Sequence, residues 1–495
     1  MPARHSFFGH PSGLATLFFT EMWERFSFYG MRAFLIFYLV ADAAHGGLAL
    51  DERTAAAIYG LYVGGTYIAC LPGGWIGDRL LGSQRAVLWG GIIIALGHVT
   101  LGLAPSERVF FLGLLIIVLG TGLLKPNTGA IVAQLYPEGG ARMDAGFTIY
   151  YIGINVGATL GPIVAGAVAE RYGWSLGFAT AAIGMAVGVV QFLRQRRRLG
   201  SAGARPMSHG SDVAQSRVAA GPKRGALIGV AILLLGVMLL WSGVLHPTAL
   251  ALQDLSTLVI IGVAVLYFGY MLFGAGLTRV ERLRVLALVV LFIGSVLFWA
   301  GYEQSGSSLN LFAERYTDRH LGALEVPATW FQSLNPIYIV VFGALFSALW
   351  VALARRGRDP STTLKFILGL LAMSASFLVM VFAARLLAHG HPVGMAWLSV
   401  TYLLQTWGEL VLSPVGLSAS SKLVPPRFVS QSLGVFFVSL SLGNLLAGRI
   451  AGDIDAANVA ALPAQFMNIV WFSALCAAGV ALTLPLMRRW TAGVH

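Results

Sequence analysis

Long apolar runs, most of them twenty or more residues in length, recur along the whole chain and are separated by short polar or glycine-rich segments. Because an α-helix rises about 1.5 Å per residue, such a run can cross a bilayer core of about 30 Å. The pattern predicts an all-α integral membrane protein with about fourteen spans, grouped as six, two and six. The predicted spans are 14–40, 54–76, 84–103, 109–135, 145–169 and 174–193, then 226–244 and 258–277, and finally 284–308, 328–354, 364–387, 395–422, 428–447 and 464–487.

The composition excludes several other classes of protein. Only 11% of the residues are charged, whereas soluble domains carry about a quarter. The net charge of +12 comes from short segments between apolar runs, so we expect no nucleic-acid partner. Cys70 and Cys476 lie in apolar runs, and no nucleophile–base set or metal-ligand spacing is visible. We therefore expect neither an enzyme nor a protein with a metal or an organic cofactor.

Basic residues divide the chain and orient it. The segment 194–224 is rich in Gly, Ser, Ala and Pro as well as Arg, and predicts a flexible cytoplasmic linker. Lys and Arg also gather in alternate short loops, such as 279–284 and 355–358, which the positive-inside rule places in the cytoplasm. Both termini are then cytoplasmic. The predicted domains are a six-helix bundle (1–193), the linker (194–224), two extra helices (225–283) and a second six-helix bundle (284–495).

Four charges lie inside the first predicted span, at Glu21, Glu24, Arg25 and Arg32. Their spacing places them on one helix face together with Phe28. Each charge at a helix centre costs about 2.5–3.5 kcal/mol when it faces lipid. These side chains must therefore pair with one another or line a hydrated cavity. A purely structural ion-pair lock is the alternative to a functional site.

Three further ionisable residues lie deep in other spans, namely Lys125, Glu303 and Glu409. Lys125 precedes Pro126, which is expected to kink its helix. Trp299 lies one turn before Glu303 and on the same face. Lone Tyr or Asn residues in a span more often form interhelical hydrogen bonds than bind a ligand. Polar groups in other spans nevertheless add candidates, namely Tyr67, Tyr150, Tyr151, Asn155, Asn335 and Ser413.

These charges predict a pocket with two poles. Arg25, Arg32 and Lys125 come from the first half of the chain, and Glu303 and Glu409 come from the second. If the halves enclose a cavity, its poles suit a zwitterion with separated ends, and aromatic side chains provide tolerant apolar walls. The carboxylates of the first span exceed what the substrate charge requires. They are therefore candidates for proton coupling.

Five short motifs are spread along the chain: Glu21-x-x-Glu24-Arg25-Phe26-x-x-Tyr29-Gly30, Gly73-Gly74-x-x-x-Asp78, Lys125-Pro126-Asn127, Phe147-x-x-Tyr150-Tyr151-x-x-x-Asn155-x-Gly157 and Trp299-x-x-x-Glu303-Gln304. With this combination, the chain resembles the proton-dependent oligopeptide transporter family of the major facilitator superfamily over nearly its whole length. The resemblance implies two six-helix bundles, two extra helices between them, and import of di- and tripeptides with protons by alternating access.

The resemblance also implies roles for individual residues. Arg32 and Lys125 would bind the peptide carboxylate, and Arg32 would alternately pair with Glu303. Phe28 departs from the family, many members of which carry a tyrosine there. Glu21, Glu24, Arg25, Lys125 and Glu303 would couple protons; Glu409, Asn155 and Asn335 would hold the amino end; and Tyr29, Tyr67, Trp299 and Ser413 would line the pocket.

The same reasoning sets the expected partners and location. These are a di- or tripeptide, protons as the coupling ion and the lipid bilayer, with the protein acting as a monomer in a bacterial inner membrane. A major facilitator carrier of a non-peptide cargo, such as an anion, an amino-acid derivative or a drug, is the main alternative. A channel is disfavoured, because neither a filter nor an oligomeric pore is visible.

Overall fold

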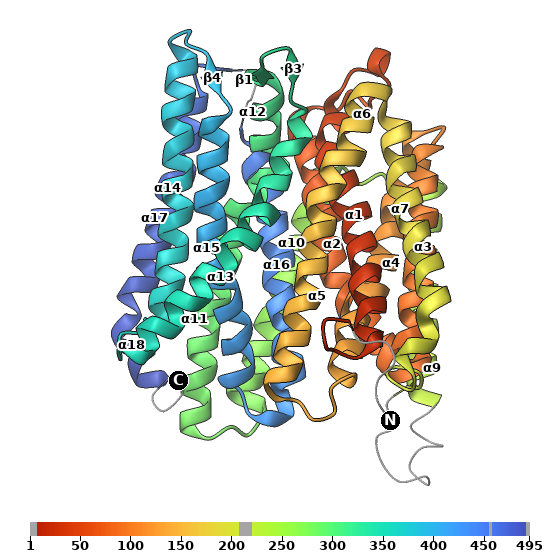
Figure 1. Ribbon diagram of the computed structural model, residues 1–495, viewed down its shortest axis with the longest axis vertical. Coiled ribbons are helices and arrows are strands. Elements are labelled where there is room, and N and C mark those ends of the chain that lie inside the picture. The colour runs from red at the N-terminus through yellow and green to blue at the C-terminus, as the bar shows by residue number, and fades with distance from the viewer. Residues whose placement is uncertain (1–6, 207–219, 455–457, 492–495) are drawn as a thin grey trace. The chain divides into compact units, whose positions relative to one another are not determined.

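The computed structural model describes residues 7–206, 220–454 and 458–491, and its secondary structure is almost entirely helical (Figure 1). Short 3₁₀ and π turns extend or join several of the helices. The helices are α1 (Ser12–Val40), α2 (Glu52–Ile76), α3 (Ser83–Gly102), α4 (Glu107–Gln134), α5 (Gly140–Gly161), α6 (Ala167–Tyr172), α7 (Trp174–Gln195), α9 (Ala220–Trp241), α10 (Ala249–Gly269), α11 (Arg279–Tyr302), α12 (Ser308–Tyr316), α13 (Leu334–Arg355), α14 (Thr362–Ala388), α15 (Ala396–Lys422), α16 (Val429–Gly452), α17 (Leu462–Leu482) and α18 (Leu484–Trp490).

Four two-residue strands lie in the connections of the second half. β1 (Thr317–Asp318) pairs in parallel with β4 (Val393–Gly394). β2 (His320–Leu321) pairs antiparallel with β3 (Leu324–Glu325). The β1–β4 pair joins the loop that follows α12 to the loop between α14 and α15, whereas β2 and β3 form a small hairpin within the first of these loops.

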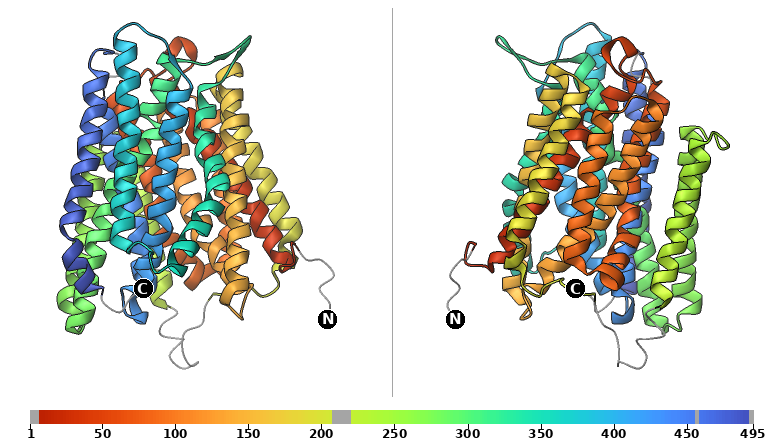
Figure 2. Two further views of the ribbon diagram at one scale, coloured as in Figure 1. Left: turned by 60° about the vertical axis from the view of Figure 1, so that its left-hand side comes forward. Right: turned by 90° about the vertical axis from the view of Figure 1, so that its right-hand side faces the viewer.

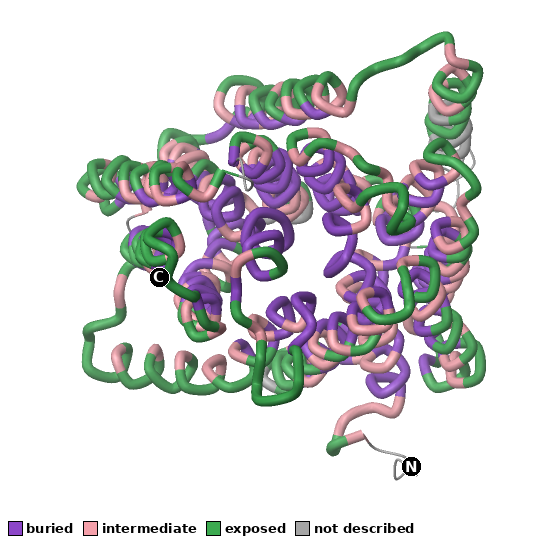
Figure 3. Tube along the Cα trace, turned by 90° about the horizontal axis from the view of Figure 1, so that it is seen from above, coloured by how far each residue is buried: buried purple, intermediate pink, exposed green. Residues whose placement is uncertain are grey.

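The helices confirm the predicted membrane architecture. Among the described residues, eleven helical segments are long and apolar enough to cross a bilayer. The helix α1, whose charges lower its hydropathy, together with α9 and α15 brings these eleven to about the fourteen that the sequence predicts. Buried positions, purple in Figure 3, gather where helices pack against one another.

The chain forms two compact units. Unit 1 comprises Met1–Met31 and Gly65–Ala251, and unit 2 comprises Arg32–Gly64 and Leu252–His495. The boundary falls inside α1 and α2, so each of these helices contributes one part to each unit. The domain boundaries expected from the sequence differ from these two units, and they remain a prediction.

In unit 1, close helix approaches depend on glycines. The helix α3 packs against α4 and α7. A Cβ atom at Gly157 of α5 would lie 2.1 Å from the Met22 carbonyl oxygen of α1, and one at Gly73 of α2 would lie 2.0 Å from the Gly122 carbonyl oxygen of α4. Only glycine allows these backbones to come so close. The α1–α5 and α2–α4 contacts bring the polar and charged side chains of these helices close to one another.

In unit 2, α14 packs against α15 and α17, and α11 packs against α16 (Figures 1 and 2). The parts of α1 and α2 that belong to this unit are hydrogen-bonded into it. Asn310 donates to the Ala33 carbonyl oxygen over 2.7 Å, and Ser441 donates to the Gly64 carbonyl oxygen over 2.8 Å. Residues 32–64 are therefore structurally part of the unit formed by the second half of the chain.

The helix α10 begins at Ala249 rather than near residue 258, where the sequence analysis placed its start. Polar Gln253 and Asp254 interrupt the apolar run there, which shortened the prediction. Both side chains bind α16 instead: Gln253 donates to the Leu445 carbonyl oxygen over 2.8 Å, and Asp254 pairs with Arg449 at 2.9 Å. Tertiary partners thus extend the helix through residues that local hydropathy disfavours.

The start of the predicted linker is held against unit 1. Gln84 donates to the carbonyl oxygens of Gly200 and Ala202 over 3.1 and 2.7 Å. Gln134 accepts from the amide of Gly203 over 2.7 Å. Residues 200–206 are therefore ordered, and residues 207–219 of the predicted linker lie outside the described residues.

Candidate functional site

Three charges of α1 form a buried cluster in unit 1. The Arg25 guanidinium makes a bidentate contact with Glu24, in which Nη2 donates to Oε1 over 2.6 Å and Nε donates to Oε2. The Arg25 Nε atom also lies 3.6 Å from Glu21 Oε1. All three side chains are at most 3% exposed. The expected pairing within this helix face is present, and Glu24 is the more tightly bound carboxylate.

Glu21 has a second set of partners, which are neutral. Its Oε2 atom accepts hydrogen bonds from Tyr150 of α5 over 2.7 Å and from Thr128 of α4 over 2.9 Å. The two hydroxyl oxygens lie 2.8 Å apart. Sequence reasoning counted Tyr150 among the polar groups of its span without giving it a role. It missed Thr128, although Thr128 follows Lys125 by three residues and so shares its helix face. Hydroxyl donors can serve a carboxyl group in either protonation state.

Lys125 lies beside an aromatic ring rather than a carboxylate. Its Nζ atom is 4.1 Å from the centroid of the Tyr67 ring, a distance typical of a cation–π contact. Within the described residues Lys125 forms no ion pair at 4 Å or less. The helix α4 continues through Pro126 to Gln134. The Gly73–Gly122 approach holds α2 against this part of α4 and so places Tyr67 next to Lys125.

A second charged group lies in unit 2. Arg32 Nη2 donates to Glu303, and Arg32 Nε donates to the hydroxyl of Tyr59 on α2 over 2.5 Å. Glu303 and Arg32 are 2% and 3% exposed. The structure therefore brings together the predicted Arg32–Glu303 pair. Tyr59 was missed, because nothing in its local sequence marks it.

Glu303 does not lie in a regular helix. It ends α11 and begins a 3₁₀ turn, Glu303–Gly306, before α12 starts at Ser308. A Cβ atom at Gly306 would lie 1.6 Å from the Tyr59 hydroxyl oxygen, so only glycine leaves room for Tyr59 to reach Arg32. Glu303 therefore lies at a break between two helices, in the middle of the long helical segment that includes α11 and α12.

Glu409 lies on α15 with polar but uncharged partners. Asn335 of α13 donates to Glu409 Oε2 over 3.0 Å and to Thr406 Oγ1 over 3.0 Å. Tyr302 also lies within hydrogen-bonding reach of Glu409. In the described part of the chain no Lys, Arg or His nitrogen comes within 4 Å of this carboxylate. Glu409 and Asn335 are both partly exposed, so a ligand can reach them.

The remaining predicted residues occupy different settings. The Tyr29 ring lies 5.8 Å from the Arg25 guanidinium carbon. Asn155 is buried and donates to the Tyr151 carbonyl oxygen of its own helix over 2.9 Å. Trp299 packs against Tyr302 at a ring distance of 5.0 Å, and its Nε1 atom has no hydrogen-bond partner among the described residues. Ser413 is partly exposed on α15, one turn beyond Glu409.

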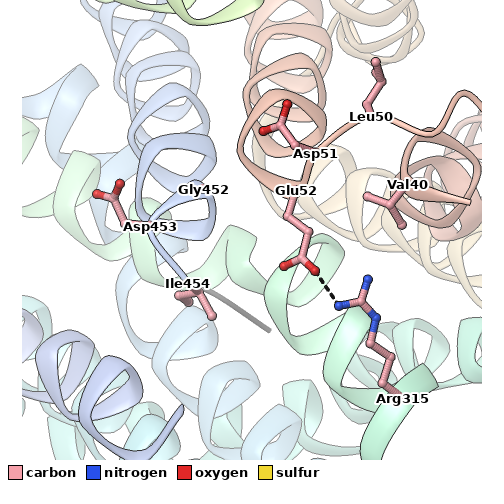
Figure 4. Close-up of a pocket in the computed structure, with 8 residues that line it drawn as sticks. All are labelled: Val40, Leu50, Asp51, Glu52, Arg315, Gly452, Asp453 and Ile454. Atoms are coloured by element: carbon pink, nitrogen blue, oxygen red, sulfur yellow. Dashed lines mark hydrogen bonds and ion pairs between the residues drawn. The ribbon is translucent and has the colours of Figure 1, made fainter. Parts of the chain in front are cut away.

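A further group of charges surrounds a pocket of about 460 Å³ in unit 2 (Figure 4). Arg315 of α12 pairs with Glu52 at the start of α2 at 2.5 Å. Arg53 pairs with Asp453 at 3.5 Å. Asp51 caps α2, and the hydrogen bonds from Thr54 lower the pKa of its carboxyl group. These pairs join the start of α2 to α12 and α16, which the sequence did not indicate.

The described residues contain eleven helical segments long and apolar enough to cross a membrane, and the chain carries buried, partly neutralised charges. These features are typical of a membrane transporter rather than of an enzyme or a soluble binding protein. The family model described as the POT family matches residues 84–472. The chain belongs to the POT family, as its motifs indicated.

Named relatives and solved structures agree with this assignment. The chain is 38% identical over 496 residues to the peptide transporter YePEPT of Yersinia enterocolitica, covering 99% of this chain and 96% of that protein. It is 36% identical over 468 residues to a di-/tripeptide transporter of Lactococcus lactis subsp. cremoris, with 91% of each chain covered. A crystal structure of a mutant peptide transporter POT in complex with alafosfalin matches with a TM-score of 0.89 and 37% identity, over 99% of this chain and 98% of that one.

Proposed function

We propose that this transporter imports di- and tripeptides together with protons by alternating access. The proposal rests on the surroundings of two charged side chains, Lys125 and Glu409. Each lies in a predicted span, and neither has an ion-pair partner among the described residues. A zwitterionic peptide supplies the two missing counter-charges. Relatives named as peptide transporters support the same substrate class.

The proposed binding roles follow from the partners of each side chain. Glu409 binds the peptide ammonium, with Asn335 orienting the carboxylate and Asn155 contributing its amide oxygen. Lys125 and Arg32 bind the peptide carboxylate. Arg32 must first leave Glu303 and Tyr59, which links substrate binding to the opening of that ion pair. Tyr29, Tyr67, Trp299 and Ser413 line the site.

Proton coupling is assigned to the α1 cluster and to Glu303. Glu21 can be protonated without losing its Tyr150 and Thr128 partners, because a hydroxyl group both donates and accepts. Glu24 and Arg25 hold that carboxyl group in place, and Lys125 contributes positive charge on α4. Protonation of Glu303 would weaken its attraction to Arg32 and release the guanidinium.

The proposed setting is a bacterial inner membrane with both termini in the cytoplasm, and a monomer as the transporting form. Basic residues gather at the ends of the spans that we assign to the cytoplasm, as in the 355–358 loop. A carrier of a simple anion is less consistent with the site, because Glu409 would repel its cargo.

A competition uptake assay tests the proposed substrate class. Vesicles containing the protein should accumulate a labelled dipeptide when an inward proton gradient is imposed. Unlabelled di- and tripeptides should compete, and peptides blocked at the amino or carboxyl end should compete at least tenfold less well, since each loses a charged contact worth about 1.5–3 kcal/mol. Uptake that is insensitive to the gradient, or equal competition by blocked peptides, would contradict the proposal.

Tyr59→Phe is expected to lower the KM for dipeptide several-fold. The change removes one hydrogen bond to Arg32 and leaves its pairing with Glu303, so the guanidinium becomes easier to transfer to the peptide carboxylate. KM and maximal rate would be measured in vesicles at fixed pH. Tyr270→Phe is the matched control, because Tyr270 is exposed at the end of the extra helices. An unchanged or raised KM for Tyr59→Phe would argue against competition for Arg32.

The two extra helices, α9 and α10, are expected to be dispensable for transport. A variant in which a Gly/Ser linker replaces them should retain measurable proton-driven uptake, although α10 is anchored to α16 through Gln253. Loss of that anchor should lower stability by about 1–3 kcal/mol, since the Leu445 carbonyl loses its partner. Gln253→Ala in the full chain controls for this effect. A correctly inserted variant without any uptake would show that α9 and α10 are required for transport.

A further inference from the structure

Six arginines from three segments gather at one end of unit 1. The last turn of α7 and the 3₁₀ turn that follows it, Arg196–Leu199, carry four of them within five positions. The helix α3, which packs against α7 (Figure 1), contributes one near its start, and the ordered part of the linker contributes one. This arginine cluster comprises Arg85, Arg194, Arg196, Arg197, Arg198 and Arg205.

Gln84 of α3 holds the three segments together. Its side-chain oxygen accepts from Arg196 Nε over 3.1 Å, and its side-chain nitrogen donates to the carbonyl oxygens of Gly200 and Ala202. Its backbone amide donates to the Gly203 carbonyl oxygen over 2.9 Å. The arginines are therefore carried by a surface whose backbone is fixed by tertiary hydrogen bonds.

The positive charge of the cluster is not balanced nearby. The stretches 79–106 and 171–206, which carry the cluster, contain no Asp or Glu. Among the described residues no carboxylate oxygen lies within 4 Å of a nitrogen of the six guanidinium groups, whereas Arg142 of the same unit pairs with Glu138 at 3.7 Å. Five of the six side chains are exposed, and Arg196 is half-buried. The cluster therefore presents its charge to the surroundings of the unit.

Two simpler roles account for part of this pattern. A cation at the end of a helix complements the helix dipole, and basic residues beside a span orient it in the membrane. The dipole effect is confined to the last turn, so it does not cover Arg85 and Arg205. Neither role requires Gln84 to bring arginines of separate segments together. Their convergence indicates a shared anionic ligand.

An exposed apolar stripe of α7 leads to the cluster. Ile183, Val187 and Val190 are 64%, 41% and 46% exposed, and steps of four and three residues place them on one helix face. The next position on this face is Arg194. Because α7 is long and apolar enough to span a membrane, its exposed apolar side chains face acyl chains, and Arg194 reaches the headgroup layer. An anionic ligand with hydrocarbon chains fits this succession of surfaces.

We propose that the arginine cluster binds the phosphate headgroups of anionic phospholipids. Arg194, Arg197 and Arg198 contact the phosphates beside the end of α7. Arg85 and Arg205 contact them from α3 and the linker. Guanidinium groups bind phosphate oxygens through paired N–H donors, and clusters of about four to eight basic residues next to a span are typical of such sites. The surface is separate from the peptide site, and the proposal does not depend on which solute is transported.

Binding of phosphatidylglycerol to the purified full-length protein tests the proposal. A fluorescent phosphatidylglycerol would be titrated into detergent micelles that contain the protein, with unlabelled phosphatidylglycerol, phosphatidylcholine and inorganic phosphate as competitors. We expect phosphatidylglycerol to compete well and the other two poorly. The variant with Arg194→Gln, Arg197→Gln and Arg198→Gln should bind about a hundredfold less tightly, at about fivefold for each lost charge.

A second variant separates the charge of these side chains from their part in the fold. The variant with Arg194→Lys, Arg197→Lys and Arg198→Lys keeps the positive charge and loses only the paired donors, so its affinity should stay within about tenfold of the wild type. A loss in the lysine variant as large as that in the glutamine variant would show that these positions act through the fold, and it would overturn the proposal.

The variant with Arg171→Gln, Arg385→Gln and Arg489→Gln is the matched control. These arginines are exposed, lie in the last turns of three different helices, and form no ion pair among the described residues. The control removes the same charge from scattered positions and should bind phosphatidylglycerol as the wild type does. Equal weakening in the control and the glutamine variant would show general surface attraction and overturn the site. Competition by inorganic phosphate or phosphatidylcholine as strong as that by phosphatidylglycerol would overturn the assignment to an anionic lipid.

Discussion

Glu21→Gln is expected to abolish proton-driven dipeptide uptake, by at least a hundredfold, while exchange of peptide across the membrane continues near the wild-type rate. Gln keeps the size and polarity of the side chain, and its amide oxygen can still accept from Tyr150 and Thr128. It cannot bind or release a proton. The loss should therefore fall on coupling alone, as seen in uptake under a proton gradient and in counterflow without one.

Glu281→Gln is the matched control for this experiment. Glu281 closes a capping box with Thr278 at the start of α11, and Gln serves equally well at that position. The control makes the same chemical change outside the buried cluster and should leave both assays unaltered. If Glu21→Gln stops exchange as completely as uptake, the cluster is a structural lock and not a coupling site.

Glu24 provides a contrast inside the same cluster. Its carboxylate holds Arg25 in a bidentate contact, and breaking a buried pair costs about 3–5 kcal/mol because one charge is left uncompensated. Glu24→Gln should therefore reduce the amount of folded protein as well as uptake. If Glu21→Gln abolishes coupling alone and Glu24→Gln also lowers the amount of folded protein, then Glu21 is the carboxylate that exchanges the proton and Glu24 is the one that holds Arg25.

Glu409→Ala should weaken the binding of peptides with a free amino terminus by about ten- to a hundredfold and leave the binding of amino-blocked peptides nearly unaffected. The estimate takes a charge-assisted hydrogen bond as worth about 1.5–3 kcal/mol. The reason is structural: among the described residues Glu409 has hydrogen-bonding partners in Asn335 and Tyr302 but no cation, and a peptide ammonium would be its counter-ion. Inhibition constants for matched free and acetylated peptides would be compared.

Two further variants separate charge from shape at Glu409. Glu409→Gln retains the volume and the hydrogen bond with Asn335, so a loss equal to that of the alanine variant assigns the effect to charge. Glu325→Gln makes the same charge change at an exposed strand residue whose ion-pair partner is Arg319, and it should leave the peptide preference unchanged. An unaltered preference for free amino termini in Glu409→Ala would remove the proposed role of this residue.

The sequence alone was sufficient for those features that depend on local composition. The apolar runs predicted the spans, because crossing a bilayer requires a continuous hydrophobic helix wherever the chain later packs. The charges in α1 and the isolated Lys125, Glu303 and Glu409 could be picked out, because a buried charge stands out against an apolar background. The motifs placed the chain in its family.

The tertiary structure decided which group each charge meets. Tyr150 reaches Glu21 only because Gly157 lets α5 approach α1, and Tyr59 reaches Arg32 only because residue 306 is a glycine. The start of α10 likewise depends on α16. Such contacts join residues more than a hundred positions apart in several cases, and hydropathy along the chain carries no information about them. The physical reason is that burial is a property of one segment, whereas pairing belongs to two segments and to the packing that brings them together.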